Sequence, residues 1–307
     1  MSQIYELPAD NPFRSDYADF VELMEPSPWK TFSSYTKYVG NFLDWVYLKK
    51  HVTDLEEITW KDYREYQKFL SLDLKGNSVN QQFSAIKKFY VGILDKQWNS
   101  AAVPNLKYDI FRGPTPVQAE VDEILRSIDS LNDWLMIALM AYCGLRKEEL
   151  VSLHYSDIRR IRGTLYVAPS KNHEDREVPL SPVILGVIER YYRALPDKPT
   201  AQDYIFPGMK EGSHLSENTV NNRLDRILEK LHWENRGYTP HSFRRFFGCS
   251  QYLAHPDDLP RLQALMGHRC LSSTMVYIKL AAAFKARMED NERVNNLLKG
   301  VVPGCAK

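Results

Sequence analysis

Four residues near the C-terminal end of the chain have side chains suited to chemistry on a phosphate ester. His241 and Arg244 are three positions apart, so a helix would place them on one face. His268 ends a Met-Gly-His segment, and Tyr277 comes nine residues later, after a Leu-Ser-Ser-Thr stretch typical of a turn and a new helix start. A tyrosine is an unusual nucleophile, because its pKa of about 10 keeps it neutral at pH 7. It suits a reaction whose product is a covalent link to phosphate and whose bond energy is kept for rejoining.

In type, order and spacing these residues resemble the C-terminal signature of the tyrosine recombinases, the phage integrase group. The signature is matched by His241-x-x-Arg244, by Met266-Gly267-His268 and by Tyr277. Each piece alone occurs by chance in many proteins, and the indication comes from their order along the chain. The resemblance covers residues from about 116 to 298.

The resemblance also requires an arginine in an earlier helix and a lysine on a β-hairpin. Arg146, in Gly-Leu-Arg-Lys-Glu-Glu-Leu, and Lys171, in a polar turn before Arg-Glu-Val-Pro-Leu, fit these two positions. In isolation Arg146 would be interpreted as a surface cation at a turn and Lys171 as a solvated lysine. Lys210, on a glycine-flanked loop, is a weaker candidate for the lysine. Glu149, one turn after Arg146, is expected to pair with that arginine or to orient a neighbour in the site.

The resemblance implies that the chain cuts and rejoins DNA, with one task for each side chain. The two arginines can grip the non-bridging oxygens of a phosphodiester with planar, permanently charged forks. His241 and His268 can donate hydrogen bonds, His241 can take up the phenol proton, and the lysine can protonate the departing 5′ oxygen. Attack by Tyr277 would give a 3′-phosphotyrosine and a free 5′ hydroxyl. No metal and no other cofactor is expected, because fixed positive charge would serve and no carboxylates are spaced for a two-metal site.

Length and composition frame this interpretation. A chain of 307 residues suits two domains, and 26% charged with 44% apolar residues is ordinary for a soluble protein. The net charge of +1 is low for a DNA-binding protein, but the first 26 residues carry six acids against Arg14 alone, so basic residues are enriched elsewhere. The four cysteines form no disulfide-like pattern, and no signal peptide or membrane-spanning run is evident. We therefore expect a cytoplasmic protein, associated with the nucleoid when bound to DNA, and no membrane partner.

The apolar periodicity predicts a mainly α-helical fold with a small β-sheet or hairpin, and the resemblance implies a two-domain DNA clamp. Helical patterns dominate the first third, and short strands are predicted at 164–167 and 177–180. Pro104, Gly113, Pro114 and Pro116 mark a break between the two parts. The predicted divisions are an acidic N-terminal segment (1–26), a helical core-binding domain (27–98), a linker (99–116), a catalytic domain (117–280) and a C-terminal tail helix (281–307).

Two predicted helices each have a polar face. Composition alone favours an ordinary solvent-exposed surface for the first helix and allows one for the second. The resemblance implies instead that both helices enter the DNA major groove, where Asn or Gln can contact bases and Lys can contact phosphate. On the first helix, whose apolar stripe begins at Val79, the candidates are Asn80, Gln81, Ser84, Lys87 and Lys88. On the second, which Ser216 caps, they are Asn218, Asn221, Asn222 and Arg226.

Two other classes of protein use parts of this pattern. A type IB topoisomerase shares the Arg, Lys, His and Tyr chemistry but relaxes DNA as a monomer, and a non-catalytic DNA-binding protein would lack the full residue set. The helical tail after Tyr277 favours a recombinase, because in that family such a tail docks on a neighbouring subunit. The partners implied are double-stranded DNA with a specific recombination site and a homo-tetramer on two such sites. Tyr252 is the nearest rival to Tyr277 as the nucleophile.

Overall fold

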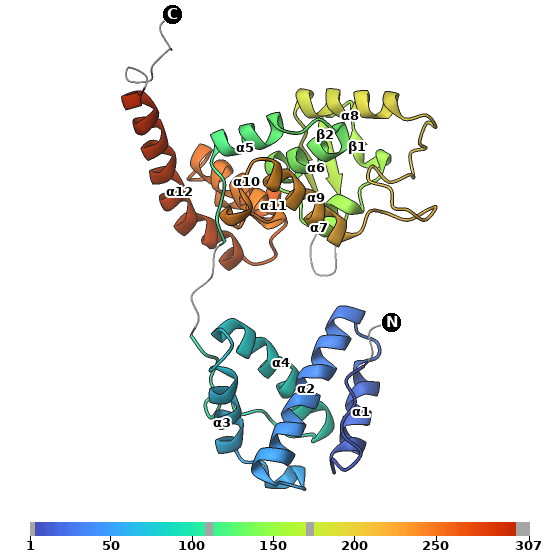
Figure 1. Ribbon diagram of the computed structural model, residues 1–307, viewed down its shortest axis with the longest axis vertical. Coiled ribbons are helices and arrows are strands. Elements are labelled where there is room, and N and C mark those ends of the chain that lie inside the picture. The colour runs from blue at the N-terminus through green and yellow to red at the C-terminus, as the bar shows by residue number, and fades with distance from the viewer. Residues whose placement is uncertain (1–3, 108–112, 170–174, 299–307) are drawn as a thin grey trace, which may run out of the picture. The chain divides into compact units, whose positions relative to one another are not determined.

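The computed structural model describes residues 4–107, 113–169 and 175–298, and the chain forms two compact units, 1–111 and 112–307 (Figure 1). The boundary between the units lies inside the range 99–116 that the sequence predicts as a linker. Both units are built mainly from helices, and the described part of the second unit also contains one small antiparallel sheet. This is the predicted fold class, mainly α with a small sheet.

The first unit is a helical cluster around aromatic side chains. Phe42 stacks on Tyr63 with ring centroids 5.1 Å apart, and Trp45 lies 5.1 Å from Tyr66. Thr59 and Asp62 form a capping box that begins the third helix, as the Thr59 cap signal predicts. The helices are α1 (Arg14–Met24), α2 (Trp29–Lys50), α3 (Trp60–Leu70) and α4 (Gly76–Ile93).

The acidic N-terminal segment is part of this cluster, although the sequence predicts it as a separate piece. Residues 14–24 form α1, which packs on α2 and α4. Its Phe20 and Met24 are fully buried, and the Phe20 ring meets Phe89 of α4 edge to face at 5.6 Å. The acidic side chains lie on the outer face of the helix, so the composition of the segment hid an apolar stripe that belongs to the core.

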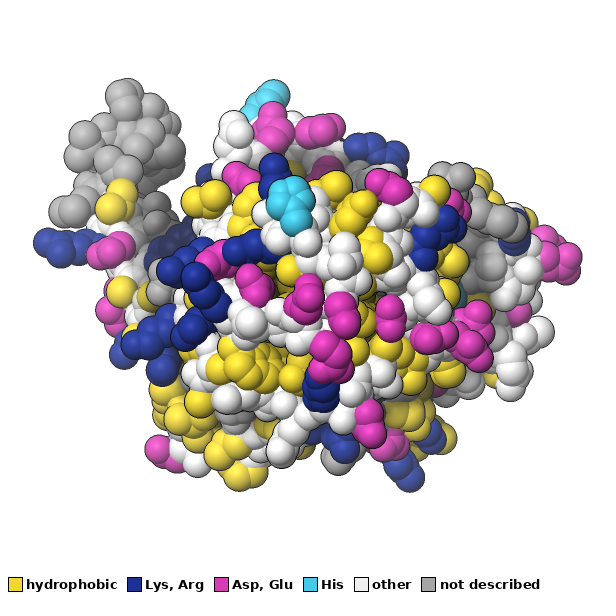
Figure 2. Space-filling view, turned by 90° about the horizontal axis from the view of Figure 1, so that it is seen from below, with side chains coloured by type: hydrophobic (Ala, Val, Ile, Leu, Met, Phe, Trp, Pro, Cys, Tyr) yellow, Lys and Arg dark blue, Asp and Glu magenta, His cyan; other side chains and the backbone are white. Residues whose placement is uncertain are grey.

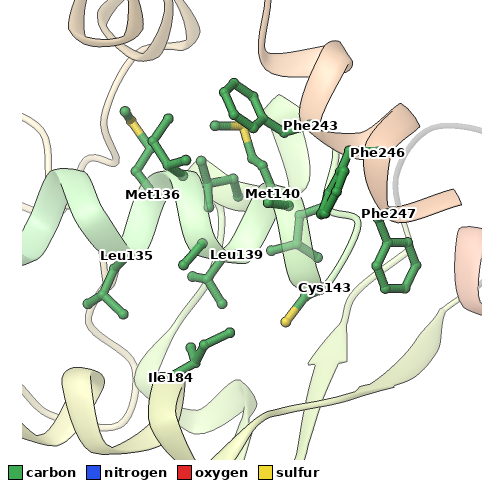
Figure 3. Packing of buried hydrophobic residues seen from close by; sticks show 14 of the residues in the cluster. Leu135, Met136, Leu139, Met140, Cys143, Ile184, Phe243, Phe246 and Phe247 are labelled. Atoms are coloured by element: carbon green, nitrogen blue, oxygen red, sulfur yellow. The ribbon is translucent and has the colours of Figure 1, made fainter. Parts of the chain in front are cut away.

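The second unit is organised around α10 (Pro240–Ala254). Every residue from Ser242 to Cys249 is buried, because α10 packs against α6 (Leu131–Tyr142) on one side and α12 (Leu271–Leu298) on another. Figure 3 shows Met140 of α6 beside Phe243 of α10, and Leu139 on the opposite side of α6, toward Ile184. The polar residues in this part of α10, among them Arg244, are therefore shielded from water.

The remaining elements of the second unit surround this core. The strands β1 (Ile158–Arg159), β2 (Thr164–Val167) and β3 (Arg176–Pro179) pair in that order, with Leu165 opposite Val178 and Val167 opposite Arg176. The predicted elements do not include α8 (Pro182–Ala194), although its start carries the ordinary signals of a Ser181 cap and Pro182 in the first turn. The other helices are α5 (Gln118–Arg126), α7 (Lys147–Val151), α8 (Pro182–Ala194), α9 (Glu217–Lys230) and α11 (Leu259–Met266).

The predicted division between a catalytic domain ending at 280 and a separate tail helix is wrong in one respect. Tyr277 and the tail belong to one continuous helix, α12, with no break near Ala281. Ala281 and Phe284 are buried, and the Phe284 ring meets Phe246 of α10 at 6.1 Å. The beginning of the tail is thus attached to its own unit. None of the helices that the structure describes is both long and apolar enough to cross a membrane.

Gly144 gives a test of the turn that leads into the site. Its φ is +63°, and a Cβ there would lie 2.3 Å from Cδ1 of Phe247. Gly144→Ala should therefore lower the free energy of unfolding by about 2 kcal/mol or more, through backbone strain and the clash. Gly186→Ala is the matched control, because it lies inside α8 with no atom within 4 Å of the added Cβ. It should stabilise by about 0.5–1 kcal/mol, and urea unfolding of both variants would measure the contrast.

Candidate active site

Arg146 stands at the N-terminus of α7, and Glu149 lies in the first turn of the same helix. The Glu149 carboxylate accepts the backbone N–H of Arg146 at 2.7 Å and Nη1 of its side chain at 2.7 Å. Gly144, with a φ of +63°, lies in the turn that separates α6 from α7, just before Arg146. The Arg146 side chain remains partly exposed, whereas that of Glu149 is buried. The capping box therefore fixes the backbone of Arg146, and its guanidinium contacts Glu149 and the Gly267 carbonyl while part of the side chain remains exposed at a cavity.

Glu149 is the meeting point of three arginines. Besides Arg146, Arg176 of β3 binds both carboxylate oxygens, at 2.9 and 2.8 Å, and Nη1 of Arg244 lies 3.7 Å from Oε2. Burial alone would raise the pKa of Glu149, but the hydrogen bonds and charge of Arg176, the charge of Arg244 and the backbone N–H of Arg146 lower it to about 2. The carboxylate is ionised at pH 7 and compensates part of the surrounding positive charge.

Arg244 is one of the largest fully buried side chains in the described residues. Its Nη1 donates to the carbonyl of Gly144 and its Nη2 to the carbonyl of Met266, which ties α10 to the turns before α7 and after α11. Burial lowers the pKa of Arg244 to about 10, followed by the charge of Arg146, so it stays protonated at pH 7. Arg244 is positioned by backbone groups, and no rotation of a surface side chain is needed to place it.

Tyr277 and His268 lie beside this arginine. Nη2 of Arg244 is 3.4 Å from Nε2 of His268, and Nδ1 of His268 is 3.1 Å from the buried Thr274 hydroxyl. The His268 and Tyr277 rings stack with centroids 5.8 Å apart. Tyr277 is only 4% exposed and lies against the α10 backbone, where a Cβ on Gly248 would be 2.4 Å from its ring.

The surroundings of the phenol act on its acidity in two directions. Burial raises the pKa of Tyr277, and the positive charges of Arg244, Arg245 and Arg146 oppose that rise without cancelling it. The hydroxyl is therefore neutral at pH 7, and attack on phosphorus requires a group that takes its proton.

His241 has the properties of such a proton acceptor. It lies at the mouth of a cavity of about 540 Å³, whose other lining residues include Arg146, Lys147, Asn221 and Asp225. Although the residue is exposed at this mouth, desolvation against the cavity wall and the charges of Arg245, Arg244 and Arg146 lower its pKa to about 4. The imidazole is neutral at pH 7 and has a free electron pair to accept a proton.

The structure brings most of the predicted catalytic residues into one region of the second unit. Arg146, Glu149 and Arg244 are joined by direct contacts, and His268 and Tyr277 continue the cluster. His241 faces the same cavity as Arg146. Lys171 lies outside the described residues. Within those residues, no group of three or more His, Cys, Asp or Glu side chains is arranged to hold a metal ion.

On α4, Gln81, Ser84, Lys87 and Lys88 are exposed, as a surface that contacts DNA requires. Asn80 differs from the other candidates. Its amide nitrogen donates to the carbonyl of Leu106 at 2.9 Å, and its amide oxygen accepts the Leu106 N–H at 2.8 Å. A bidentate contact to a base would need the amide edge that already binds Leu106, so in this structure Asn80 fastens the chain near residue 106 to α4.

On α9, Asn218, Asn222 and Arg226 are exposed, and Asn221 is half-buried at the cavity wall. Arg226 donates to the backbone carbonyl of Asn222 at 3.3 Å. Of these four residues, Asn221 lines the cavity that Arg146 also lines, whereas Arg226 lines a different cavity with Asp133 and Tyr191. Asp225 lines the cavity of Arg146 as well and was not among the predicted residues. Figure 2 shows a group of basic side chains at the left of the face it displays and acidic side chains across its middle.

Arg176 is the most important residue that the sequence analysis did not assign. It was used only as part of the Arg-Glu-Val-Pro-Leu run that places Lys171. Alternation along β3 puts Arg176 and Val178 on the inward face and Glu177 on the outward face. A charged residue on the inward face of a strand is a signal of a buried partner, and that signal was present in the sequence.

Comparison with known proteins agrees with this geometry. Residues 117–283, just over half of the chain, match the phage integrase family. Tyrosine recombinase XerA of Pyrococcus horikoshii is 26% identical over 300 residues, covering 93% of this chain and 95% of the relative. A putative integrase/recombinase of Sinorhizobium fredii, y4qK, is 29% identical over 228 residues, covering 72% of this chain and 71% of the relative.

Solved structures show the same fold at lower identity. The Tn1549 transposon integrase in complex with transposon right-end DNA aligns with a TM-score of 0.68 at 16% identity, over 90% of this chain and 98% of that one. The XerH recombinase bound to its difH substrate aligns with a TM-score of 0.67 at 17% identity, over 88% and 81%. The chain belongs to the phage integrase family, the tyrosine recombinases. It is a site-specific DNA recombinase that binds DNA.

The titration of His241 tests the electrostatics of the site. We expect a midpoint near 4 in the protein without DNA, and Arg146→Gln should move it upward, because one of the cations that disfavour imidazolium is removed. NMR titration of the ring protons measures both, with His241→Gln assigning the signal. Because the unfolded chain binds this proton at about 6.5, the contribution of His241 to stability falls as the pH drops from 6.5 toward 4. A midpoint at or above 6.5 would contradict the proposed environment.

Proposed function

We propose that Tyr277 is the nucleophile of this recombinase and that it forms a 3′-phosphotyrosine with one DNA strand. The observation that carries the proposal is the packing of the phenol against His268, whose ring nitrogen lies 3.4 Å from the buried guanidinium of Arg244. A phosphodiester carries one negative charge, and attack adds a second in the transition state. Positively charged groups held at fixed positions stabilise that added charge and so raise the rate.

The roles of the other residues follow from their protonation and exposure. Arg146 and Arg244 bind the non-bridging oxygens, with Arg146 presented at the cavity and Arg244 held from behind. Neutral His241 accepts the phenol proton, and His268 donates to the phosphate. Lys171 protonates the 5′ oxygen as it leaves. Tyr277 is buried in this structure, so DNA must reach it through a rearrangement of the residues that cover it.

The DNA is double-stranded and carries a specific site that both units read. Exposed Gln81, Ser84, Lys87 and Lys88 of α4 support contact by the first unit. In the second unit α9 supplies Asn221 at the cavity wall and the exposed residues Asn218, Asn222 and Arg226. Because its substrate is chromosomal or mobile DNA, we place the enzyme in the cytoplasm with the nucleoid.

Tyr277→Phe tests the proposed nucleophile. The DNA is a duplex selected by the wild-type protein from a random-sequence library and then nicked close to the cleavage point, so that a cut strand is released. The variant should bind this duplex with unchanged affinity in a mobility-shift assay and form no covalent complex on a denaturing gel, because the attacking oxygen is missing. Tyr252→Phe is the matched control on the neighbouring helix and should retain covalent attachment. Attachment that persists in Tyr277→Phe and vanishes in Tyr252→Phe would overturn the assignment.

We propose further that four protomers act together on two DNA sites and that the end of α12 makes the contact between them. Arg287 fixes the middle of the helix to its own unit, with bonds to Thr115 (2.8 Å), Glu120 (2.6 Å) and Tyr238 (3.2 Å). Beyond it, the Met288 and Val294 side chains are exposed. Exposed apolar side chains beyond the point where Arg287 fixes the helix support docking on a neighbour, in a head-to-tail arrangement that closes into a ring.

Truncation after Asp290 tests this assembly and leaves the Arg287 anchor in place. We expect one protomer to bind a half-site as the full chain does, whereas cooperative filling of a full site and strand exchange should fall at least tenfold. Mobility shifts on the selected duplex count the protomers, and a plasmid with two sites reports exchange. Arg287→Ala with an intact tail is the matched control for a loosened α12. If the truncated protein assembles and recombines normally, the tail serves only its own unit; relaxation of supercoils without exchange by the full chain would favour a topoisomerase.

A further inference from the structure

Arg176 is a buried arginine whose partner is a residue of the active site. It lies at the start of β3, and its side chain is 5% exposed. Its two terminal nitrogens bind the two oxygens of Glu149 at 2.9 and 2.8 Å, as a planar fork binds a carboxylate. Its Nε is buried and has no hydrogen-bond partner. Burying an arginine in this way costs free energy. Stability alone does not explain the pair, because apolar side chains at such positions often stabilise a protein equally well.

The hydrogen bonds of Glu149 show what the pair accomplishes. Oε1 accepts from Nη1 of Arg146 and Nη1 of Arg176, and Oε2 accepts from the Arg146 backbone and Nη2 of Arg176. Arg176 neutralises the carboxylate, so that the charges of Arg146 and Arg244 remain for a phosphate. Without Arg176, the carboxylate would attract the Arg146 fork and Arg244, 3.7 Å away, more strongly.

Arg176 also supports the turn that carries His268. A Cβ on Gly267 would lie 2.9 Å from Nη1 of Arg176, and the residue has a φ of +59°. The Gly267 carbonyl in turn lies 3.4 Å from Nη2 of Arg146. The guanidinium of Arg176 is therefore packed between Glu149 and the Gly267 backbone immediately before His268.

We propose that Arg176 is a positioning residue for DNA cleavage. It holds Glu149 and the Gly267 turn so that Arg146, Arg244 and His268 keep the geometry that the transition state requires. This inference rests on the proposed function of those three residues. Arg176 contacts Glu149 and has a side chain that is only 5% exposed, so its loss should change the rate of cleavage and leave binding intact.

Cleavage of the selected, nicked duplex by Arg176→Lys and Arg176→Ala tests the proposal. The rate of covalent-complex formation at saturating protein should fall by about 10- to 100-fold, as expected when reacting groups are misplaced, while half-site affinity stays within about twofold. Lysine keeps the charge but cannot bind both oxygens, so Arg176→Lys should remain well below the wild type. Arg261→Ala is the matched control, because this exposed arginine lines the same surface cavity of about 480 Å³ without contacting Glu149.

Rescue of Arg176→Ala by added guanidinium distinguishes a positioning role of Arg176 from a general loss of structure. Arg176 borders the 480 Å³ cavity, so its removal opens a path to Glu149 from that side. Guanidinium chloride at concentrations well below those that unfold proteins should restore at least a fifth of the lost rate in Arg176→Ala. It should have no effect on Arg176→Lys, where the site is occupied, and none on the wild type.

A double-mutant cycle with Glu149→Gln supplies the second criterion. If Arg176 acts through Glu149, the Arg176→Ala change should cost much less in the Glu149→Gln background than in the wild type. The proposal is overturned if Arg176→Ala cleaves within twofold of the wild type, if the two losses multiply independently, or if half-site binding falls in parallel with cleavage. If the wild type itself forms no covalent complex on the duplex that it selects, the result contradicts the proposed function as well as this inference.

Discussion

The carboxylate of Glu149 is the constraint on which the site depends. It brings Arg146, Arg176 and Arg244 together in a small volume, where three positive charges would otherwise repel one another strongly. Each of its oxygens accepts two hydrogen bonds, so the buried charge is fully satisfied. The cluster keeps a surplus of positive charge, which a DNA phosphate can use.

The same positive charges explain how a neutral His241 can lie beside a site suited to binding an anion. Desolvation and the arginine charges that we propose to bind a phosphate lower the pKa of His241, and burial raises the pKa of Tyr277. One group is thus free to accept a proton at pH 7 and the other has one to give. Their different environments, a cavity mouth and the packed surface of α10, separate the two roles.

Backbone groups do much of the positioning. The carbonyls of Gly144 and Met266 hold Arg244, and the Gly267 carbonyl approaches Arg146. Such contacts depend on the turns before α7 and after α11, where glycines have positive φ. The site therefore depends on the folding of the whole second unit, since α6, α10 and α12 must pack before these turns meet. Arg287 extends the same dependence to the tail through Glu120 and Tyr238.

The sequence by itself determined the class of enzyme and indicated most of the residues proposed for its reaction. His241, Arg244, His268 and Tyr277 carry distinctive chemistry at short separations, and helix periodicity is a local property that a linear pattern records. The capping signals of Thr59 and Ser216 likewise placed helix starts within a residue of those in the structure. The fold class, mainly α with a small sheet, followed from the same local patterns.

The tertiary structure decided which polar residues face inward and what they contact. Arg176 and Glu149 are 27 positions apart, and no local pattern states that their side chains meet. Asn80 looked free to read bases, but its amide is bonded to Leu106, 26 positions away. The acidic N-terminal segment contains α1, one face of which is buried in the core. Composition averages over all faces of a helix and therefore does not show a single apolar face. Contacts between distant segments arise from packing, and packing is the information that a single sequence does not display.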